Sequence, residues 1–397
     1  MRENVICLGK KYDIIKKIKN LGYNLVLVHS QNNDSADEHV FLLERDAQYK
    51  KFDLEKLFSK YKKKQFSGVI VPSEYYVELA PQILSYLSLK TKGLTLKQAE
   101  ITRNKLLLKQ TLQDLDIPTT RFAKVIDVTD FDSLARFLGM PFLIKPKKEV
   151  LARGIEIVYN KNKWEEWWNL HNKNLSEFYA EEYLTDIKEY CCDTIVADEK
   201  VLAQFPGEYT ISCLESNRAH NGIGVNFPGF LPRTEIDQLK EYTKDFLEKL
   251  GLKDGYFHVE FFYTKQGWKF GEIGCRLPGG YQLPTESYIA GQDLLETYLK
   301  IMINTEPTPT QTINTEGRYF GYYLYPKKVG KIRKITTSLE YPWIVESKVH
   351  VKEGQFLEDE DSSVTMAAHI VYKANSLEDL KKYSDYAKDL IKIEYED

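Results

Sequence analysis

The chain has 397 residues, of which 43% are hydrophobic, 55 are Lys or Arg and 58 are Asp or Glu, giving a formal net charge of −3. This balance gives no reason to expect nucleic acid or an anionic membrane as the main partner, and no apolar run approaches the roughly 20 residues that a membrane-spanning helix needs. Because chains longer than about 250 residues usually divide into domains, we expect two to four compact units.

The first part of the chain alternates between strands and helices. The apolar segments NVICLG, NLVLVHS and FSGVIVPS predict strands, and YDIIKKIKNLG and YYVELAPQILSYLSL have apolar residues at helical spacing. This alternation predicts a small parallel α/β domain, residues 1–97. Its first turn, CLGKKYD, has one glycine where a dinucleotide-binding turn has three, so an NAD-dependent oxidoreductase is not favoured.

A small α+β lobe is predicted for residues 98–180. The segment TLKQAEITRNKLLLKQTLQDLD predicts one long helix, PFLIKP and IEIVYN predict strands, and KWEEWWNLHNKN predicts an amphipathic helix. The three tryptophans of that last helix are spaced i, i+3 and i+4, which is typical of a buried face.

A third unit, residues 181–303, begins in FYAEEYL and continues through the strands EYCCDTIVAD and KVLAQFP and a hairpin to the helix GQDLLETYLKIMI. The Thr- and Pro-rich segment 304–317 predicts a linker. Residues 304–397 predict a C-terminal domain that completes the large lobe, with strands around the helix SLEDLKKYSDYAKDLIK.

The five cysteines are odd in number and lack the paired spacing of metal sites. They are therefore expected to be free thiols in a reducing cytoplasm. The first residues, MRENVICLGKKYDIIKK, contain no apolar stretch long enough for a secretion signal, which favours the same location.

The hairpin carries two acids on segments that otherwise predict buried strands. Glu260 lies in YFHVEFFYT and Glu272 in GWKFGEIG, and KQG between them suits a three-residue loop with Gly267 in the left-handed conformation. This loop sets the register, and the predicted cross-strand pairs are Thr264 with Trp268, Phe262 with Phe270, and Glu260 with Glu272. Cross-strand partners share one face, so the two carboxylates are expected to lie side by side.

Two ionised carboxylates at that distance repel each other and lose hydration. They could share a proton, be bridged by a cation such as Arg276, or hold a divalent metal together; two exposed strand ends without a metal are the remaining alternative. Oxygen ligands suit Mg²⁺ or Mn²⁺ rather than zinc, and Mg²⁺ is usually held by one or two carboxylates plus substrate phosphates. His258 shares this face and is expected to be packed rather than facing a substrate.

Three other features carry possible chemistry. Lys145 lies in the otherwise apolar FLIKP, so it is either at a wet edge or directed at an anion. Lys105 lies on the preceding helix, and its local sequence favours a solvated side chain. The segment AEEYL, residues 180–184, is either an ordinary strand or a connector whose backbone groups could meet a planar base.

In this order the segments resemble the ATP-grasp superfamily of carboxylate–amine ligases, over about residues 98–300. The matching segments are NKLLLKQTLQDLDIPTT, PFLIKP, YAEEYLTDIKEYCCDTIV, HVEFF and GEIGCRLPGG. The amino-acid and dipeptide ligases resemble this chain most, in length and in their final small domain. The resemblance implies an α/β protein with the ATP-grasp fold. A small α+β lobe would lie over a larger antiparallel sheet, between a parallel α/β domain and a small C-terminal α+β domain.

The resemblance implies a role for each matching residue. Those expected to contact ATP are Lys105 at the α-phosphate, Lys145 near the phosphates and adenine, Glu181, Glu182, Tyr183 and Leu184 at the adenine edge, and Glu189 near the ribose. Glu260 and Glu272 would bind Mg²⁺, with Mn²⁺ as an alternative. Arg276 would be catalytic, beside the carboxylate substrate and its acyl phosphate.

Two departures from the superfamily pattern concern the phosphate region. Gly274 stands where a further metal ligand, an asparagine, is common, so a second Mg²⁺ is in doubt. The loop over the phosphates, KKEVLARGIEIV, has only Gly154 where several glycines are common. Its charged side chains, Lys147, Lys148 or Arg153, could replace backbone amides.

The implied activity is ATP-dependent formation of an amide or peptide bond through an acyl phosphate, on an amino-acid substrate, with release of ADP and phosphate. The partners would be small-molecule carboxylates and amines and a second copy of the chain in a homodimer, with no nucleic acid or membrane. The segment 206–232 could line the acceptor pocket through Glu215, Arg218 or His220, or be a surface excursion. Two alternatives stay open: loading of a carboxylate onto the thiol of a carrier protein, and nucleotide binding without turnover.

Overall fold

The computed structural model describes residues 3–11, 13–29, 36–41, 54–61, 65–150, 152–303, 311–358 and 366–396. Residues 304–310 of the predicted linker lie outside these ranges. In the described ranges, none of the helices combines the length and the apolar character that crossing a bilayer requires. All five cysteines are free thiols, as expected.

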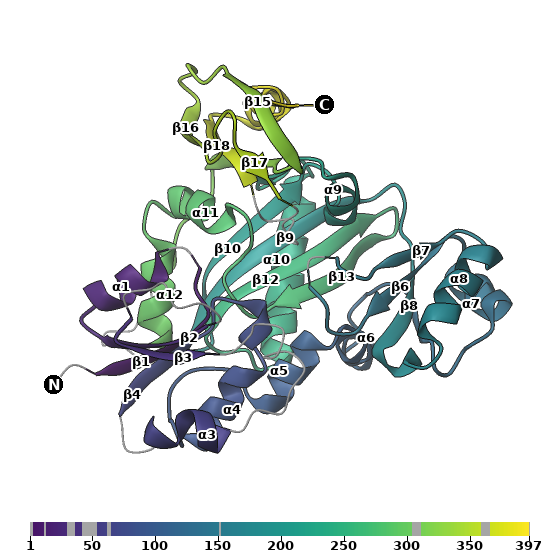
Figure 1. Ribbon diagram of the computed structural model, residues 1–397, viewed down its shortest axis with the longest axis horizontal. Coiled ribbons are helices and arrows are strands. Elements are labelled where there is room, and N and C mark those ends of the chain that lie inside the picture. Colours follow the sequence, from purple (N-terminus) through teal and green to yellow (C-terminus); the bar gives the residue numbers. More distant parts are fainter. Residues whose placement is uncertain are drawn as a thin grey trace.

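The N-terminal domain is a parallel sheet covered by helices on both faces (Figure 1). Its strands lie in the order β3-β2-β1-β4 and are β1 (Asn4–Leu8), β2 (Asn24–His29), β3 (Glu38–Phe41) and β4 (Phe66–Ile70). Its helices are α1 (Ile14–Asn20), α3 (Leu54–Phe58) and α4 (Leu79–Tyr86), with short 3₁₀ turns η1 (Ser59–Tyr61) and η2 (Glu74–Tyr76). Alternate residues of β1 and β2 pack against α1 on one face and α4 on the other, which confirms the predicted parallel α/β fold.

The long helix predicted after this domain is two helices, α5 (Leu96–Arg103) and α6 (Lys105–Asp114). Asn104 between them is non-helical, with φ −97° and ψ 99°, and its side chain accepts a hydrogen bond from the backbone N–H of Leu107 at 3.2 Å. The prediction of one helix was wrong because asparagine satisfies the orphan N–H groups of a new helix start. Lys105 is consequently the first residue of α6.

The small lobe is a four-stranded antiparallel sheet in the order β5-β8-β6-β7, covered by two helices. The elements are β5 (Phe122–Lys124), α7 (Phe131–Leu138), β6 (Phe142–Pro146), β7 (Glu156–Val158), α8 (Lys161–His171), η3 (Leu175–Glu177) and β8 (Phe178–Glu182). We expected β8 to begin the third unit; instead it pairs with β5 and β6 in this sheet. Strand pairing depends on residues that are distant in the sequence, and the local alternation of apolar and polar residues does not indicate which sheet a strand joins.

The large lobe is an eight-stranded sheet in the order β13-β12-β9-β10-β11-β14-β18-β16. Its strands are β9 (Lys188–Ala197), β10 (Lys200–Tyr209), β11 (Ile223–Phe227), β12 (Gly255–Thr264), β13 (Gly267–Gly274), β14 (Tyr319–Pro326), β16 (Ile344–Val349) and β18 (Met366–Ala374). Its helices are α9 (Cys213–Ala219), α10 (Arg233–Lys249), α11 (Gln282–Ala290) and α12 (Leu294–Met302). Residues after 317 therefore complete a sheet that β9 and β10 begin.

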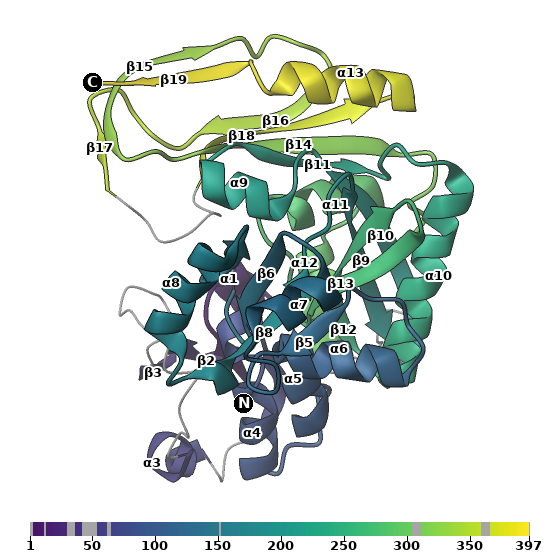
Figure 2. The same ribbon diagram turned by 90° about the vertical axis from the view of Figure 1, so that its right-hand side faces the viewer.

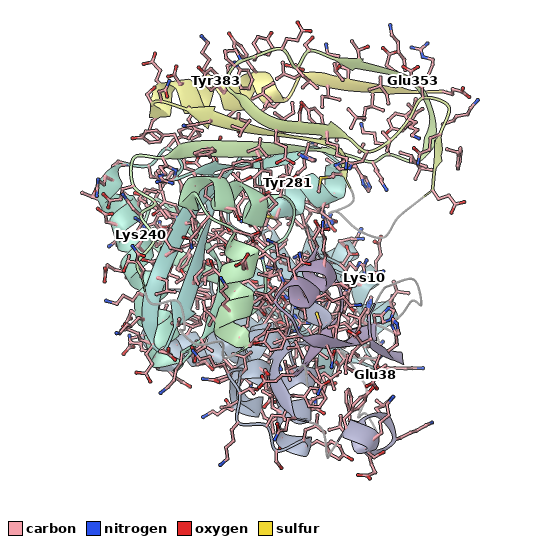
Figure 3. The ribbon with its side chains drawn as sticks, turned by 90° about the vertical axis from the view of Figure 1, so that its left-hand side faces the viewer. Lys10, Glu38, Lys240, Tyr281, Glu353 and Tyr383 are labelled. Carbon is pink, nitrogen blue, oxygen red and sulfur yellow. The ribbon has the colours of Figure 1, made fainter. Side chains whose placement is uncertain are left out.

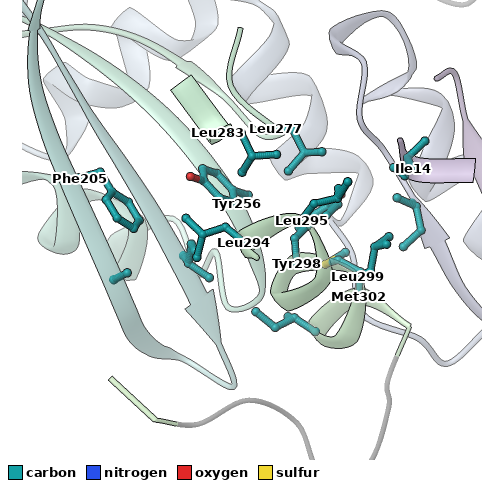
Figure 4. Close-up of a cluster of buried hydrophobic side chains, with 14 of the residues drawn as sticks. Ile14, Phe205, Tyr256, Leu277, Leu283, Leu294, Leu295, Tyr298, Leu299 and Met302 are labelled. Atoms are coloured by element: carbon teal, nitrogen blue, oxygen red, sulfur yellow. The ribbon is translucent and has the colours of Figure 1, made fainter. Parts of the chain in front are cut away.

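A further three-stranded sheet, β17-β15-β19, lies with α13 at the end of the molecule away from the N-terminal domain (Figure 2). These elements are β15 (Gly330–Thr337), β17 (Phe356–Leu357), α13 (Leu377–Ala387) and β19 (Ile391–Tyr395). Side chains of α12 fill the space between the large sheet and the N-terminal domain, where Leu299 and Met302 lie toward Ile14 (Figure 4). On the outer surface of the large lobe, Lys240 marks α10, and Lys10 of the N-terminal domain lies on the opposite side of that view (Figure 3).

The hairpin of β12 and β13 has the predicted pair of acids but a different register near the turn. Glu260 lies opposite Glu272, as predicted, and Gly267 has a φ of +96°. The pairs nearer the turn include Thr264 with Gly267, Tyr263 with Trp268, and Phe261 with Phe270, so the loop has two residues instead of three. A bulge between Glu260 and Phe261, which adds Gly271 to the other strand, compensates for the shorter loop. The two differences from the prediction cancel at the glutamates.

Trp164 forms the centre of the small-lobe core, with its ring 6.2 Å from that of Phe142 and 5.5 Å from that of Trp167. Trp164→Ala should lower the free energy of unfolding by about 3–5 kcal/mol, because the cavity cannot be refilled. Leu170→Ala is the matched control on the same helix, since Leu170 is 79% exposed; it should change stability by less than about 0.5 kcal/mol. Urea denaturation followed by hydrogen exchange of the lobe would measure both, and equal effects would contradict the assignment of this core.

Candidate active site

A cleft of about 1220 Å³ lies where the N-terminal domain, the small lobe and the large sheet meet. All ten residues predicted to contact ATP, metal or substrate line it: Lys105, Lys145, Glu181, Glu182, Tyr183, Leu184, Glu189, Glu260, Glu272 and Arg276. They come from three strands of the large sheet, two strands of the small lobe, the helix before it, and the loops that follow β8 and β13. The fold thus gathers residues that are up to 171 positions apart in the sequence.

Glu181 is buried at the back of the cleft between two lysines. Its carboxylate oxygens lie 2.8 Å from Nζ of Lys109 and 2.8 Å from Nζ of Lys145, and the Tyr179 hydroxyl donates to it at 3.0 Å. Burial opposes its charged form, but the two lysines outweigh burial and hold the pKa of Glu181 well below its usual range. This carboxylate therefore fixes Lys145, while its backbone stays in the strand. Sequence reasoning missed Lys109, whose i, i+4 spacing from Lys105 was the available signal.

Glu182 connects the two lobes. Its carboxylate accepts hydrogen bonds from Nε of Arg121 at 2.8 Å in the small lobe and from Nζ of Lys269 at 2.6 Å on β13 of the large sheet. Tyr183 and Leu184 follow directly, where the chain crosses between the sheets along the cleft wall. The start of the crossing segment is thereby tied to both lobes.

Glu260 and Glu272 face the cleft from adjacent strands, and each has a cationic neighbour. Oε1 of Glu272 lies 2.7 Å from Nζ of Lys105, which also donates to the Glu149 carbonyl at 2.7 Å. Lys105 is only 14% exposed, so the solvated side chain favoured by its local sequence is wrong. Oε1 of Glu260 lies 3.1 Å from Nε2 of His258. Burial opposes ionisation of Glu260, but His258 and then Arg276 lower its pKa.

Glu189 differs from these acids because the nearby charge of Lys145, which favours its ionised form, does not outweigh the groups that oppose it. Its Oε2 accepts a hydrogen bond from the backbone N–H of Cys213 at 2.7 Å. Burial and the nearby charge of Glu260 raise the pKa of Glu189 above its ordinary value. A carboxyl group with a raised pKa can both donate and accept hydrogen bonds, which suits it to a hydroxyl group.

The donor set fits Mg²⁺ that is partly held by phosphates. The described ranges contain no group of three or more His, Cys, Asp or Glu side chains able to hold a metal by themselves. The opposed carboxylates of Glu260 and Glu272 supply two oxygen ligands, and Mg²⁺ usually takes one or two carboxylates, with water and substrate phosphate oxygens completing its octahedron. Gly274 has no side chain and therefore cannot supply a third protein ligand.

Arg276 is held by a residue of the N-terminal domain. Its Nε lies 2.8 Å from Oε2 of Glu74, whose other oxygen lies 2.8 Å from Nη1 of Arg103. Nothing in the local sequence VPSEYY indicates this role, because the contact spans 202 positions.

The segment 206–232 is partly ordered cleft wall and not a surface excursion. Its helix α9 and the turn before it line the cleft with residues 208–217, including Glu215. Arg218 points instead to the small lobe, where it donates to the Ile155 carbonyl at 3.2 Å, and it does not line the cleft; nor does the exposed His220.

Comparisons with known proteins agree with this geometry. The model of the ATP-grasp domain matches residues 110–278, and that of the L-amino acid ligase C-terminal domain 2 matches residues 322–396. Residues 110–278 of this chain thus form an ATP-grasp domain. This confirms the predicted resemblance and fold, and with them an ATP-dependent ligase that forms carbon–nitrogen bonds.

Among its relatives is an L-arginine-specific L-amino acid ligase of Bacillus subtilis, 25% identical over 311 residues that make up 75% of this chain and 73% of the relative. The L-amino acid ligase of Bacillus licheniformis has a similar fold, with a TM-score of 0.75 at 18% identity over 100% of this chain and 99% of that one. A biotin carboxylase domain of Hydrogenobacter thermophilus, with a TM-score of 0.73 at 16% identity over 98% and 90% of the chains, was solved with ADP and magnesium. The roles of individual residues stay predictions.

His258 is buried, as expected, and it also lines the cleft. Its Nδ1 lies 2.5 Å from Oδ1 of the fully buried Asp193, on the side away from Glu260. Burial lowers the pKa of a histidine, but Asp193 and Glu260 outweigh burial and raise the pKa of His258 from 6.5 to about 9.

The charged His258 should therefore stabilise the metal-free protein in a pH-dependent way. Since its pKa is higher in the folded than in the unfolded chain, its contribution to the free energy of unfolding is fully present below pH 6.5 and is lost as the pH rises through about 9. In EDTA, His258→Gln should lower Tm most near pH 6, and the gap to the wild type should narrow toward pH 9.5. A gap of constant size across this range would contradict the assignment.

Proposed function

We propose that this chain activates the carboxylate of an amino acid with ATP and Mg²⁺, as an acyl phosphate, and transfers the acyl group to an amine. The observation that carries this proposal is the opposed pair Glu260 and Glu272, facing a cleft that also holds Lys105, Lys145 and Arg276. Phosphoryl transfer requires alignment and neutralising charge more than covalent chemistry from the protein, and this set of side chains supplies both.

Each end of the nucleotide has a matching part of the cleft. The backbone of residues 181–184 would meet the adenine edge, and Glu189 would meet the ribose. Lys145, fixed by Glu181, and Lys105, beside Glu272, would hold the phosphates. Glu260 and Glu272 would hold Mg²⁺, which when bound neutralises charge on the phosphate oxygens.

The acyl phosphate would form under Arg276, beside the backbone of Gly279 and Gly280, which also line the cleft. An amine could attack it directly, so no protein nucleophile is needed. The cysteines near the cleft support this, because burial raises the pKa of Cys275 to about 12 and that of Cys213 well above its usual value, which leaves both as poorly reactive thiols.

The identity of the amino acid, the homodimer and the cytoplasmic location stay predictions. The name of the Bacillus subtilis relative makes arginine the first substrate to include. A thiol acceptor on a carrier protein would differ in one observable, an acyl adduct of the carrier that mass spectrometry detects.

Purified protein with ATP, Mg²⁺ and pooled amino acids including arginine should release ADP, whereas ATP and Mg²⁺ without any carboxylate should release almost none. Removal of Mg²⁺ with EDTA should abolish release, because without the metal the two carboxylates would repel the phosphates. A coupled ADP assay measures this. ATP binding without ADP release in any pool would favour the nucleotide-binding alternative.

Removing the charge of either Glu272 or Arg276 should strongly lower the rate of turnover. Glu272→Gln and Arg276→Ala should each lower kcat at least about 100-fold, the size of effect seen when one preorganised electrostatic contact to a transition state is removed. Glu166→Gln, on the exposed face of α8, is the matched control and should change kcat less than twofold, as is usual for ~0.5 kcal/mol surface substitutions. Normal turnover by both cleft variants would refute the proposed site.

A further inference from the structure

Glu74 extends from the N-terminal domain into the cleft. It begins η2, three residues beyond Val71 at the carboxyl end of the parallel strand β4, which is where open parallel sheets usually present functional groups. Its side chain is only 11% exposed, and both of its oxygens are engaged. Oε1 lies 2.8 Å from Nη1 of Arg103, and Oε2 lies 2.8 Å from Nε of Arg276.

These contacts fix the orientation of Arg276. A guanidinium group is planar, and its donors point in fixed directions. Nε donates to Glu74 at 2.8 Å, and Nη1 donates to the Leu277 carbonyl at 2.8 Å. Two hydrogen bonds from different nitrogen atoms determine the plane of the group, so its position relative to Glu260 and the glycines of the cleft is set before a substrate arrives.

The charges make Glu74 hard to replace. Arg103 is 2% exposed and Arg276 is 20% exposed, and both guanidinium groups lie on the same carboxylate. Without that negative charge the two cations would repel each other in a partly dry site. Burial opposes the charged form of Arg276, but the carboxylate of Glu74 outweighs burial and raises the pKa of Arg276.

Gly274 leaves room for this pair. A Cβ atom at Gly274 would lie 3.1 Å from Oε2 of Glu74 and 3.3 Å from Cζ of Arg276, closer than most Cβ contacts in proteins. A side chain at position 274 and the present Glu74–Arg276 pair therefore compete for the same space. The absence of a side chain at this point of β13 is consistent with a structural need for the pair.

We infer that Glu74 is a positioning residue through which the N-terminal domain orients Arg276 for the carboxylate substrate. This inference rests on the role proposed for Arg276. Glu74 also connects Arg276 to the loop over the phosphates, because Nη2 of Arg103 donates to the Lys148 carbonyl at 2.8 Å. The N-terminal domain is thus part of the active site and not only a neighbour of it.

Glu74→Gln should raise KM for the amino acid and lower kcat, so that kcat/KM falls about 10- to 100-fold, as expected when a reacting group loses its alignment. KM for ATP should change less than about threefold, because the contacts of Lys105 and Lys145 stay in place. The matched control is Asp254→Asn, which removes a similarly buried carboxylate, 16% exposed and 2.8 Å from Lys92, outside the cleft. It should leave kcat/KM within about twofold at a comparable loss of Tm.

A double-mutant cycle with Arg276→Lys separates positioning from a general structural role. If Glu74 acts through Arg276, adding Glu74→Gln to Arg276→Lys should lower kcat/KM less than about threefold further. Effects that multiply in the double variant, or an unchanged kcat/KM in Glu74→Gln, would overturn the inference.

If Glu74→Gln does not fold, Gly274→Ala provides a second test, because it crowds the Glu74–Arg276 pair and keeps both charges. This variant should raise KM for the amino acid and leave KM for ATP unchanged. Equal changes in the two KM values would also overturn the inference. If the wild-type protein releases no ADP with any carboxylate, that result would instead refute the proposed function.

Discussion

Glu260 and Glu272 lie opposite each other on adjacent strands, and the site depends on how their like charges are neutralised. In a half-buried position two such carboxylates cannot both stay ionised without positive charge nearby. Lys105 supplies it for Glu272, and His258 supplies it for Glu260. A magnesium ion with its nucleotide would join two carboxylates whose negative charge neighbouring cations already balance.

Further ion pairs around the cleft link the N-terminal domain, the small lobe and the large sheet. Glu182 accepts from Lys269, which ties the small lobe to the large sheet, and Lys148 pairs with Glu78 of the N-terminal domain at 2.7 Å. Such pairs are worth little where solvent reaches them but more where they are buried and hydrogen-bonded on both sides. Their value here is mainly geometric, because they set the position of the lobes around the cleft.

Local patterns were sufficient for much of the fold. Apolar runs separated by amphipathic helices predicted the parallel N-terminal domain, and the spacing of Trp164 and Trp167 predicted their burial. The break at Asn104 was missed because one capping side chain overrides the helical periodicity on both sides of it. The hairpin register was predicted with a three-residue loop, and only the bulge at Gly271 brought Glu260 opposite Glu272 in the real two-residue turn.

The sequence by itself determined which ionisable residues lie on apolar strands, and the order of these segments predicted the ATP-grasp fold. It could not determine their partners. The partner of Glu181 is Lys109, that of Arg276 is Glu74, and that of His258 is Asp193. Each partner favours the charged form of the residue that it contacts and fixes its orientation, and each lies 65 or more positions away in the sequence. Contacts of that kind leave no periodic trace in a sequence, because they arise only when separate sheets and domains pack around a common cleft; the tertiary structure alone decided them.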